Sequence, residues 1–64
     1  MRLTEVWNRM AAHLGAAYAT SYAHDQVLPQ LGGRTVDQAL ASGDDVKAVW
    51  RAVVEALELP PSER

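Results

Sequence analysis

The segment from Gly32 to Leu57 constrains the fold more than any other part of this sequence. It opens with a pair of glycines, passes through a short apolar stretch to Gly43, and ends in a longer run rich in apolar residues. The apolar residues of that run are spaced at i, i+3, i+4, i+7, i+8 and i+11: Val46, Val49, Trp50, Val53, Val54 and Leu57. Because this spacing puts all of them on one face of a helix, it predicts an amphipathic helix over about residues 45–58.

A shorter helix is predicted over about residues 36–42, just before the long one. Thr35 is followed three residues later by a glutamine, and this pair is typical of a capping box at a helix start. Gly43 is expected to end the short helix in the left-handed conformation, which costs glycine little. Asp44 or Asp45 then caps the start of the long helix.

Two further helices are predicted in the first half of the chain, over about residues 4–14 and 16–28. Thr4 is the expected N-cap of the first, Gly15 separates the two, and Pro29 stops the second. The apolar face of the first helix consists of Leu3, Val6, Trp7, Met10 and Leu14. The face expected for the second is partly polar and consists of Ala17, Tyr18, Ser21, Tyr22 and Asp25. The residues expected to fill the core beneath the following turn are Val27, Leu28 and Leu31.

These elements predict an all-α fold, a small three- to four-helix bundle with a helix-turn-helix-like C-terminal helical hairpin. We expect the chain to form a single helical domain over residues 1–64, with residues 60–64 as a frayed tail. A chain this short buries only about 60% of the surface that its unfolded form exposes, which leaves little room for a catalytic cleft. Cysteine is absent, and no apolar run approaches the roughly 18 residues of a membrane span. We therefore expect a cytoplasmic protein.

The side chains that could support catalysis or bind a metal are few and scattered. His13 and His24 lie on different predicted helices, without the HxxxH spacing typical of a metal site. Ser21, His24 and Asp25 suggest a catalytic triad, but one short helix cannot also supply an oxyanion hole and a substrate cleft. The glycine pair before Arg34 lacks the lysine and the preceding strand of a phosphate-binding loop. We expect no enzymatic activity, no cofactor and no metal.

The aromatic residues indicate a possible interaction surface. Trp7 and Trp50 lie on apolar faces, where a core position is the ordinary role, yet so small a bundle has difficulty enclosing two indoles and two tyrosine rings. Exposed tryptophan and arginine recur as anchors at protein interfaces. The residues predicted to bind a partner are therefore Lys47, Trp50, Arg51 and Arg34. Arg34 can instead pair with Asp37, three residues later, as a solvated bridge. The leading hypothesis is an interaction module that binds a protein partner or itself.

The alternative is a DNA-binding helix-turn-helix protein. Four positions fit that motif: Ala39, Gly43, Val49 and Ala52. However, Ser42 and Asp44 flank the turn glycine, where apolar residues are typical. Asp44 and Asp45 would also repel phosphates at the start of the recognition helix. The net charge of −2 and the scattered basic residues do not produce the basic face that DNA binders use.

Four stretches carry a resemblance: MRLTEVW at the start, GAAYA, VLxxLGGRTVDQAL, and VWRAV near the end. Together they resemble a small actinobacterial family of unknown function, catalogued as domain of unknown function 3046, over the chain through about Pro60. The family pattern often has cysteine after VWRAV, where this sequence has Val54, which argues against a thiol-based role. The resemblance implies a compact helical protein without an assigned activity. Its genes often lie near a recombinase gene and its regulator, which weakly connects the DNA-binding alternative with DNA repair.

Overall fold

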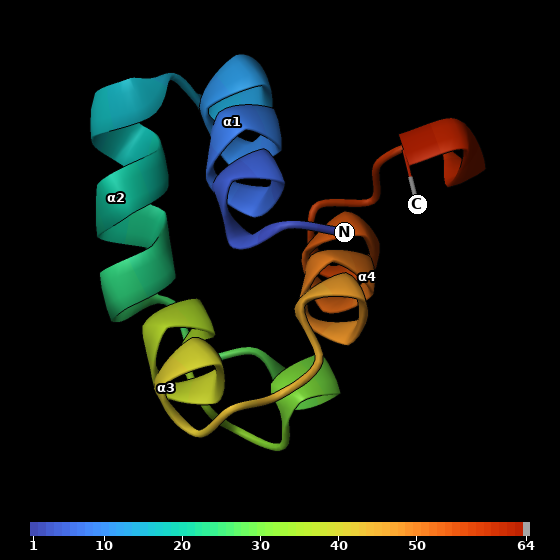
Figure 1. Cartoon of the computed structure of the whole chain (residues 1–64). Coiled ribbons are helices and arrows are strands. Elements are labelled where there is room, and N and C mark those ends of the chain that lie inside the picture. The colour runs from blue at the N-terminus through green and yellow to red at the C-terminus, as the bar shows by residue number, and fades with distance from the viewer. Residues whose placement is uncertain (64) are drawn as a thin grey trace.

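The fold is built from four α-helices, which a computed structural model places within residues 1–63, the part of the chain that it describes (Figure 1). The helices are α1 (Leu3–Leu14), α2 (Ala16–Asp25), α3 (Val36–Ala41) and α4 (Val46–Ala56). Two short 3₁₀ turns follow α2 and α4, at η1 (Pro29–Leu31) and η2 (Pro61–Glu63). Within residues 1–63, no helix has both the length and the apolar character needed to cross a membrane. The predicted all-α bundle is confirmed.

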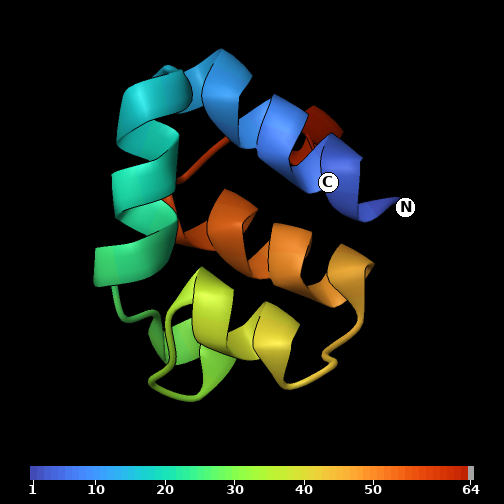
Figure 2. The ribbon, with the colours of Figure 1, turned by 60° about the vertical axis from the view of Figure 1, so that its left-hand side comes forward.

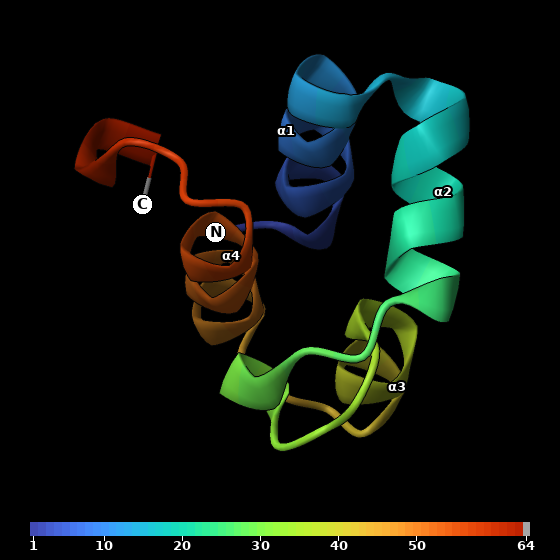
Figure 3. The same cartoon turned by 180° about the vertical axis from the view of Figure 1, so that it is seen from behind.

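α4 is the central helix of the bundle. It lies between α1 on one side and α3 on the other, while α2 closes one edge of the molecule (Figure 2). The view from behind shows η1 beside α4 and α3, and η1 also packs on α4 (Figure 3). Because α4 has neighbours on several sides, five of its 11 residues are buried: Val49, Trp50, Ala52, Val53 and Val54. The helical period read from the sequence is confirmed, and Val46 and Leu57 from the same pattern pack at the margin of the core.

α1 begins at Leu3, one residue before the predicted start. Its N-cap is Arg2, whose carbonyl accepts a hydrogen bond of 3.0 Å from the N–H of Glu5. The expected cap at Thr4 is therefore wrong, because Thr4 already lies inside the first turn. Gly15 ends α1 and begins α2 with a φ of 83°, which confirms the predicted break.

The face of α2 that packs on the core differs from the predicted one. The buried residues are Ala19, Tyr22 and Ala23, so only Tyr22 of the expected set is buried. The other members of that set are exposed: Ala17, Tyr18, Ser21 and Asp25. Two alanines on the core side allow close packing of α2 on its neighbours. Alanine is too common and too weakly apolar to mark a face in a periodicity pattern.

α2 ends at Asp25, three residues earlier than predicted, because the chain is already extended at Gln26 and Leu28. The residue before a proline favours this extended conformation, which explains Leu28. Leu28 and the later Leu31 are buried as predicted, whereas Val27 is 58% exposed. Neighbouring side chains in an extended segment point to opposite sides, so burying Leu28 turns Val27 outward.

The short helix α3 begins with the predicted capping box. The Thr35 hydroxyl accepts from the N–H of Gln38 at 3.1 Å, and the Gln38 side chain accepts from the N–H of Thr35 at 2.9 Å. After the helix, the Gly43 N–H bonds to the carbonyl of Leu40 and the next N–H bonds to the carbonyl of Ala39, both at 3.1 Å. This pair of bonds is a Schellman motif, and Gly43 has the left-handed φ of 83° that the motif requires. The glycine stop is confirmed.

α4 begins at the predicted cap and ends in a second Schellman motif. The Asp45 side chain accepts from the N–H of Ala48 at 3.3 Å. At the other end, the N–H of Leu59 bonds to the carbonyl of Val54 at 3.0 Å. The residue in the left-handed position is Glu58, with a φ of 54°, where most proteins use glycine. The helix therefore stops two residues before the predicted bound of 58.

Candidate functional site

The four residues predicted to bind a partner include one that is buried. Lys47 and Arg51 lie one turn apart on α4 and are both exposed. Trp50 has an exposed fraction of 0% and so takes the core role, not the surface role considered for it. The physical reason is the central position of α4. Arg34 is partly buried and lies between η1 and α3.

Arg34 fixes the loop after η1 to the turn before α4. Its guanidinium makes two hydrogen bonds to the carboxylate of Asp44, at 3.2 and 2.5 Å, and its Nε donates to the carbonyl of Leu31 at 2.8 Å. The hydrogen bond from Arg34 lowers the pKa of Asp44, and the same bond raises the pKa of Arg34. The expected Arg34–Asp37 bridge is therefore wrong. Asp37 lies 3.4 Å from Nδ1 of His24 instead.

Trp50 is covered by groups from both ends of the chain. The guanidinium of Arg9 lies over its ring, 5.9 Å from the centroid, and the His13 ring stacks on it at 6.4 Å. The indole N–H donates to the main-chain carbonyl of Glu63. The same carbonyl accepts from Arg9 at 3.4 Å, and the Glu63 carboxylate accepts from Nε2 of His13 at 2.7 Å.

The C-terminal segment is more ordered than the sequence predicted. Pro61–Glu63 forms the 3₁₀ turn η2, which is hydrogen-bonded to side chains of α1 and α4, so the frayed tail is wrong for these residues. Residue 64, the last of the predicted tail, lies outside the described residues. The contacts that hold η2 join residues 13 to 54 positions apart, which no local pattern reveals.

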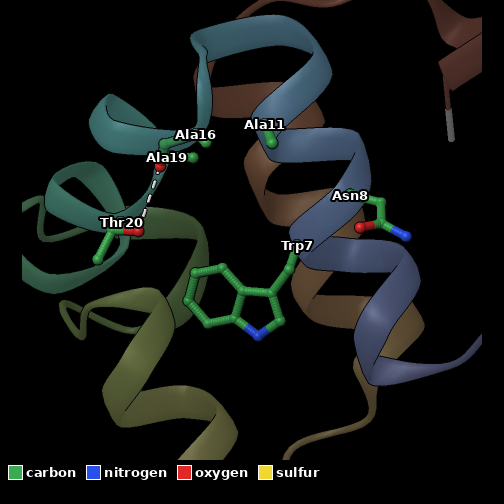
Figure 4. Close-up of a pocket in the computed structure, with 6 residues that line it drawn as sticks. All are labelled: Trp7, Asn8, Ala11, Ala16, Ala19 and Thr20. Atoms are coloured by element: carbon green, nitrogen blue, oxygen red, sulfur yellow. Dashed lines mark hydrogen bonds between the residues drawn. The ribbon is translucent and has the colours of Figure 1, made fainter.

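A depression lies between α1 and α2. It has a volume of about 340 Å³. Its lining residues are Trp7, Asn8, Ala11, Ala16, Ala19 and Thr20. In Figure 4 the indole of Trp7 extends from α1 toward α2, below the alanines at the α1–α2 turn. Trp7 is only partly buried, and packs at the edge of the core.

The sequence favoured a core position for Trp7 and left open whether its indole is exposed, but it did not predict a binding site there. The helical period placed it correctly toward the core side of α1, since it contacts the buried cluster. The sequence does contain a sign of this exposure: the residues around Gly15 that come to lie near Trp7 are alanines, namely Ala11 before the glycine and Ala16 and Ala19 after it. Side chains this small cannot cover an indole ring, so part of the ring stays open.

The candidate catalytic groups take separate structural roles. His24 faces Asp37 of α3 and not its neighbour Asp25, so the structure does not assemble the triad with Ser21. The two adjacent aspartates before α4 also have different roles. Asp44 pairs with Arg34, and Asp45 caps the helix. Among residues 1–63, no group of three or more histidines or carboxylates is placed to hold a metal ion.

Tyr22 of α2 is a buried titratable side chain. Burial on the inner face of α2 raises its pKa, and the exposed Tyr18, whose ring centroid lies 6.3 Å away, raises it further. Both effects favour the neutral phenol, so Tyr22 contributes packing in the core and no charge.

Comparison with protein families agrees with the resemblance seen in the sequence. The model of a family described as "Protein of unknown function (DUF3046)" matches residues 1–62. No curated protein and no solved structure matches the chain.

Proposed function

We propose that the chain, which belongs to the DUF3046 family of proteins of unknown function, is a non-enzymatic protein-interaction module of the cytoplasm. The binding surface is the depression between α1 and α2, and the partner fills it with an apolar side chain carried on a helix. The observation that carries the proposal is the partly exposed indole of Trp7 among uncharged lining residues. A chain without cysteine suits the reducing cytoplasm.

The lining chemistry favours an apolar protein segment as the ligand. Trp7 offers one large apolar face, and the three alanines keep the flanking helix surfaces low, so that a partner backbone can approach. The Thr20 hydroxyl already donates to the carbonyl of Ala16 at 3.2 Å, inside its own helix. Asn8 then supplies the polar group that fixes the register of the ligand, as pockets with a few placed polar groups do.

The shape of the surface favours a helix from another protein. Leu3, Trp7 and Ala11 are spaced by four residues and so lie along one side of α1, with Leu3 47% exposed. A row of this kind suits a partner helix whose apolar residues recur at i, i+3 or i+4, and i+7. A stable symmetric dimer buries about 800 Å² per copy. That is about a fifth of the 3925 Å² surface of this molecule, far more than one small depression offers.

Two matched variants test the proposal. Ala16 lines the depression and Ala17 does not, yet both are exposed in the first turn of α2. A carboxylate near a helix N-terminus is favourable at either position, so Ala16→Glu and Ala17→Glu should fold equally well. In quantitative affinity capture from native cells, we expect a partner that the wild type and Ala17→Glu retain and Ala16→Glu loses.

Two outcomes of that experiment contradict the proposal. Identical partner lists for all three proteins would show that the depression is not the binding surface. A wild type that sediments as a dimer, and becomes a monomer in Ala16→Glu, would make a second copy the occupant in place of another protein.

DNA binding is the second candidate, and the Arg34–Asp44 ion pair is the observation in its favour. The pair neutralises one of the two carboxylates before α4, while Lys47 and Arg51 stay exposed on that helix. Against it, Asp45 remains at the start of α4 and the net charge is −2. A true DNA binder must lose affinity steeply as salt rises, so the absence of duplex binding at low salt would end this candidate.

A further inference from the structure

Three side chains from two helices converge on one residue of the C-terminal turn. Trp50 of α4 and Arg9 of α1 both donate to the main-chain carbonyl of Glu63. His13, one turn after Arg9, donates to the carboxylate of the same residue at 2.7 Å. A main-chain carbonyl and an acidic side chain are thus recognised together, as they would be in a bound peptide.

The segment that carries Glu63 is held by these polar contacts and by little else. Pro60, Pro61 and Ser62 are exposed, and Glu63 itself is only partly buried. A single 3₁₀ turn has few internal hydrogen bonds, so the segment has little stability of its own. If this segment detached, the indole N–H of Trp50 would lose its hydrogen-bond acceptor. An unpaired buried donor costs free energy, so binding of another acceptor would be favourable.

We propose that Arg9, His13 and Trp50 form a binding site for an acidic peptide of a partner protein, which the chain's own Pro61–Glu63 occupies at rest. The partner peptide supplies one carboxylate for His13 and one main-chain carbonyl for Trp50 and Arg9. The carboxylate of Glu5, 3.8 Å from Arg9, leaves that arginine partly paired, so His13 carries most of the selectivity for the acidic side chain and the indole adds affinity through the main-chain carbonyl. This site is separate from the Trp7 depression, and the inference does not depend on it.

The test uses the full chain with its resting occupant weakened. Glu63→Lys removes the carboxylate that His13 binds and places a positive charge beside Arg9. The control is Glu55→Lys, which makes the same charge change at an exposed position of α4. The probe is an acetylated and amidated synthetic peptide, Leu-Pro-Pro-Ser-Glu, with the sequence of residues 59–63. NMR follows the indole N–H signal of Trp50, with that of Trp7 as an internal reference.

The expected result is a saturable shift of the Trp50 signal in Glu63→Lys, while the Trp7 signal stays in place. Wild type and Glu55→Lys should need at least ten-fold more peptide, because the attached segment competes at a high effective concentration. A peptide with glutamine in place of glutamate should bind at least ten-fold more weakly. If Glu63→Lys does not fold, Glu63→Gln serves as the weakened variant, with the same expectations.

Three results would overturn the inference. One is a Trp50 signal that does not move at millimolar peptide in a folded variant. The second is equal binding of the glutamate and glutamine peptides. The third is a wild type that dimerises through exchanged C-terminal segments and becomes a monomer in Glu63→Lys, which would assign the site to a second copy of the chain.

Discussion

At the scale of single residues, the two tryptophans have the same side chain and opposite roles. Both lie on apolar helix faces, but Trp50 is fully buried on the central helix, whereas Trp7 lies beside alanines and stays partly exposed. A helical period identifies the face on which a residue lies. It does not tell how many neighbours cover that face, and here the neighbours decide which indole stays partly exposed in the folded chain.

Trp50→Ala should unfold the protein or nearly so. Removing a buried aromatic side chain costs about 3–5 kcal/mol. The core of so small a domain supplies only about 3–5 kcal/mol of stability, so this loss is as large as the whole contribution. The matched control is Arg51→Ala, at the exposed neighbouring position, which should change stability by less than about 0.5 kcal/mol. Urea unfolding followed by circular dichroism measures both, and equal stabilities would contradict the buried position of Trp50.

Glu58→Gly should stabilise the protein. Glu58 holds a φ of 54°, in the left-handed region that favours glycine, and relieving this strain should gain about 0.5–1 kcal/mol. Glu55→Gly, inside α4, should instead destabilise the protein by about 1 kcal/mol, because glycine is a poor helix former. Thermal unfolding of the two variants gives the comparison. A lower thermal unfolding midpoint for Glu58→Gly than for the wild type would show that the backbone at Glu58 is not strained.

At the scale of elements, the turns explain how a short chain positions its helices. The capping box before α3 and the glycine stop after it were predictable, because caps depend on residues three or four positions apart. The early end of α2 and its alanine face were not, since they depend on packing against other helices. The loop between α2 and α3 is closed by a hydrogen bond of 3.0 Å from the N–H of Leu28 to the carbonyl of Arg34.

The ion pair between Arg34 and Asp44 should make stability depend on pH in acid. The hydrogen bond from Arg34 lowers the folded-state pKa of Asp44. A carboxylate of this kind stabilises the fold above its unfolded pKa, and the contribution is lost as the pH falls through the lowered folded pKa. The advantage of wild type over Asp44→Asn should therefore be full at neutral pH and should shrink below about pH 4, the ordinary aspartate value.

Urea unfolding of both proteins across the acid range measures this advantage. Arg34→Gln removes the partner that lowers the pKa of Asp44, so its stability should follow that of Asp44→Asn. If the stability difference between wild type and Asp44→Asn grew as the pH fell, it would contradict a stabilising role for this ion pair.

At the scale of the whole molecule, the size of the core determines what is left for binding. The buried cluster centres on α4, and the small residues of the α1–α2 corner leave a depression in place of more core. The fold class and the central helix could be predicted from the helical spacing. The candidate site could not, because it combines Trp7 with residues across the α1–α2 turn. The C-terminal cover of Trp50 was hidden for a similar reason, since it joins Arg9 and His13 to Glu63 across almost the whole chain.

The most direct test of the account is acrylamide quenching of tryptophan fluorescence in wild type and in Trp7→Phe. Our central claim is that the indole of Trp7 is partly open to solvent in the folded chain, whereas the indole of Trp50 is fully buried. We expect Trp7→Phe to stay folded, to lose most of the quenching, and to emit at the shorter wavelength of a shielded indole. A Trp7→Phe protein that remains folded and is quenched as strongly as the wild type would contradict this claim.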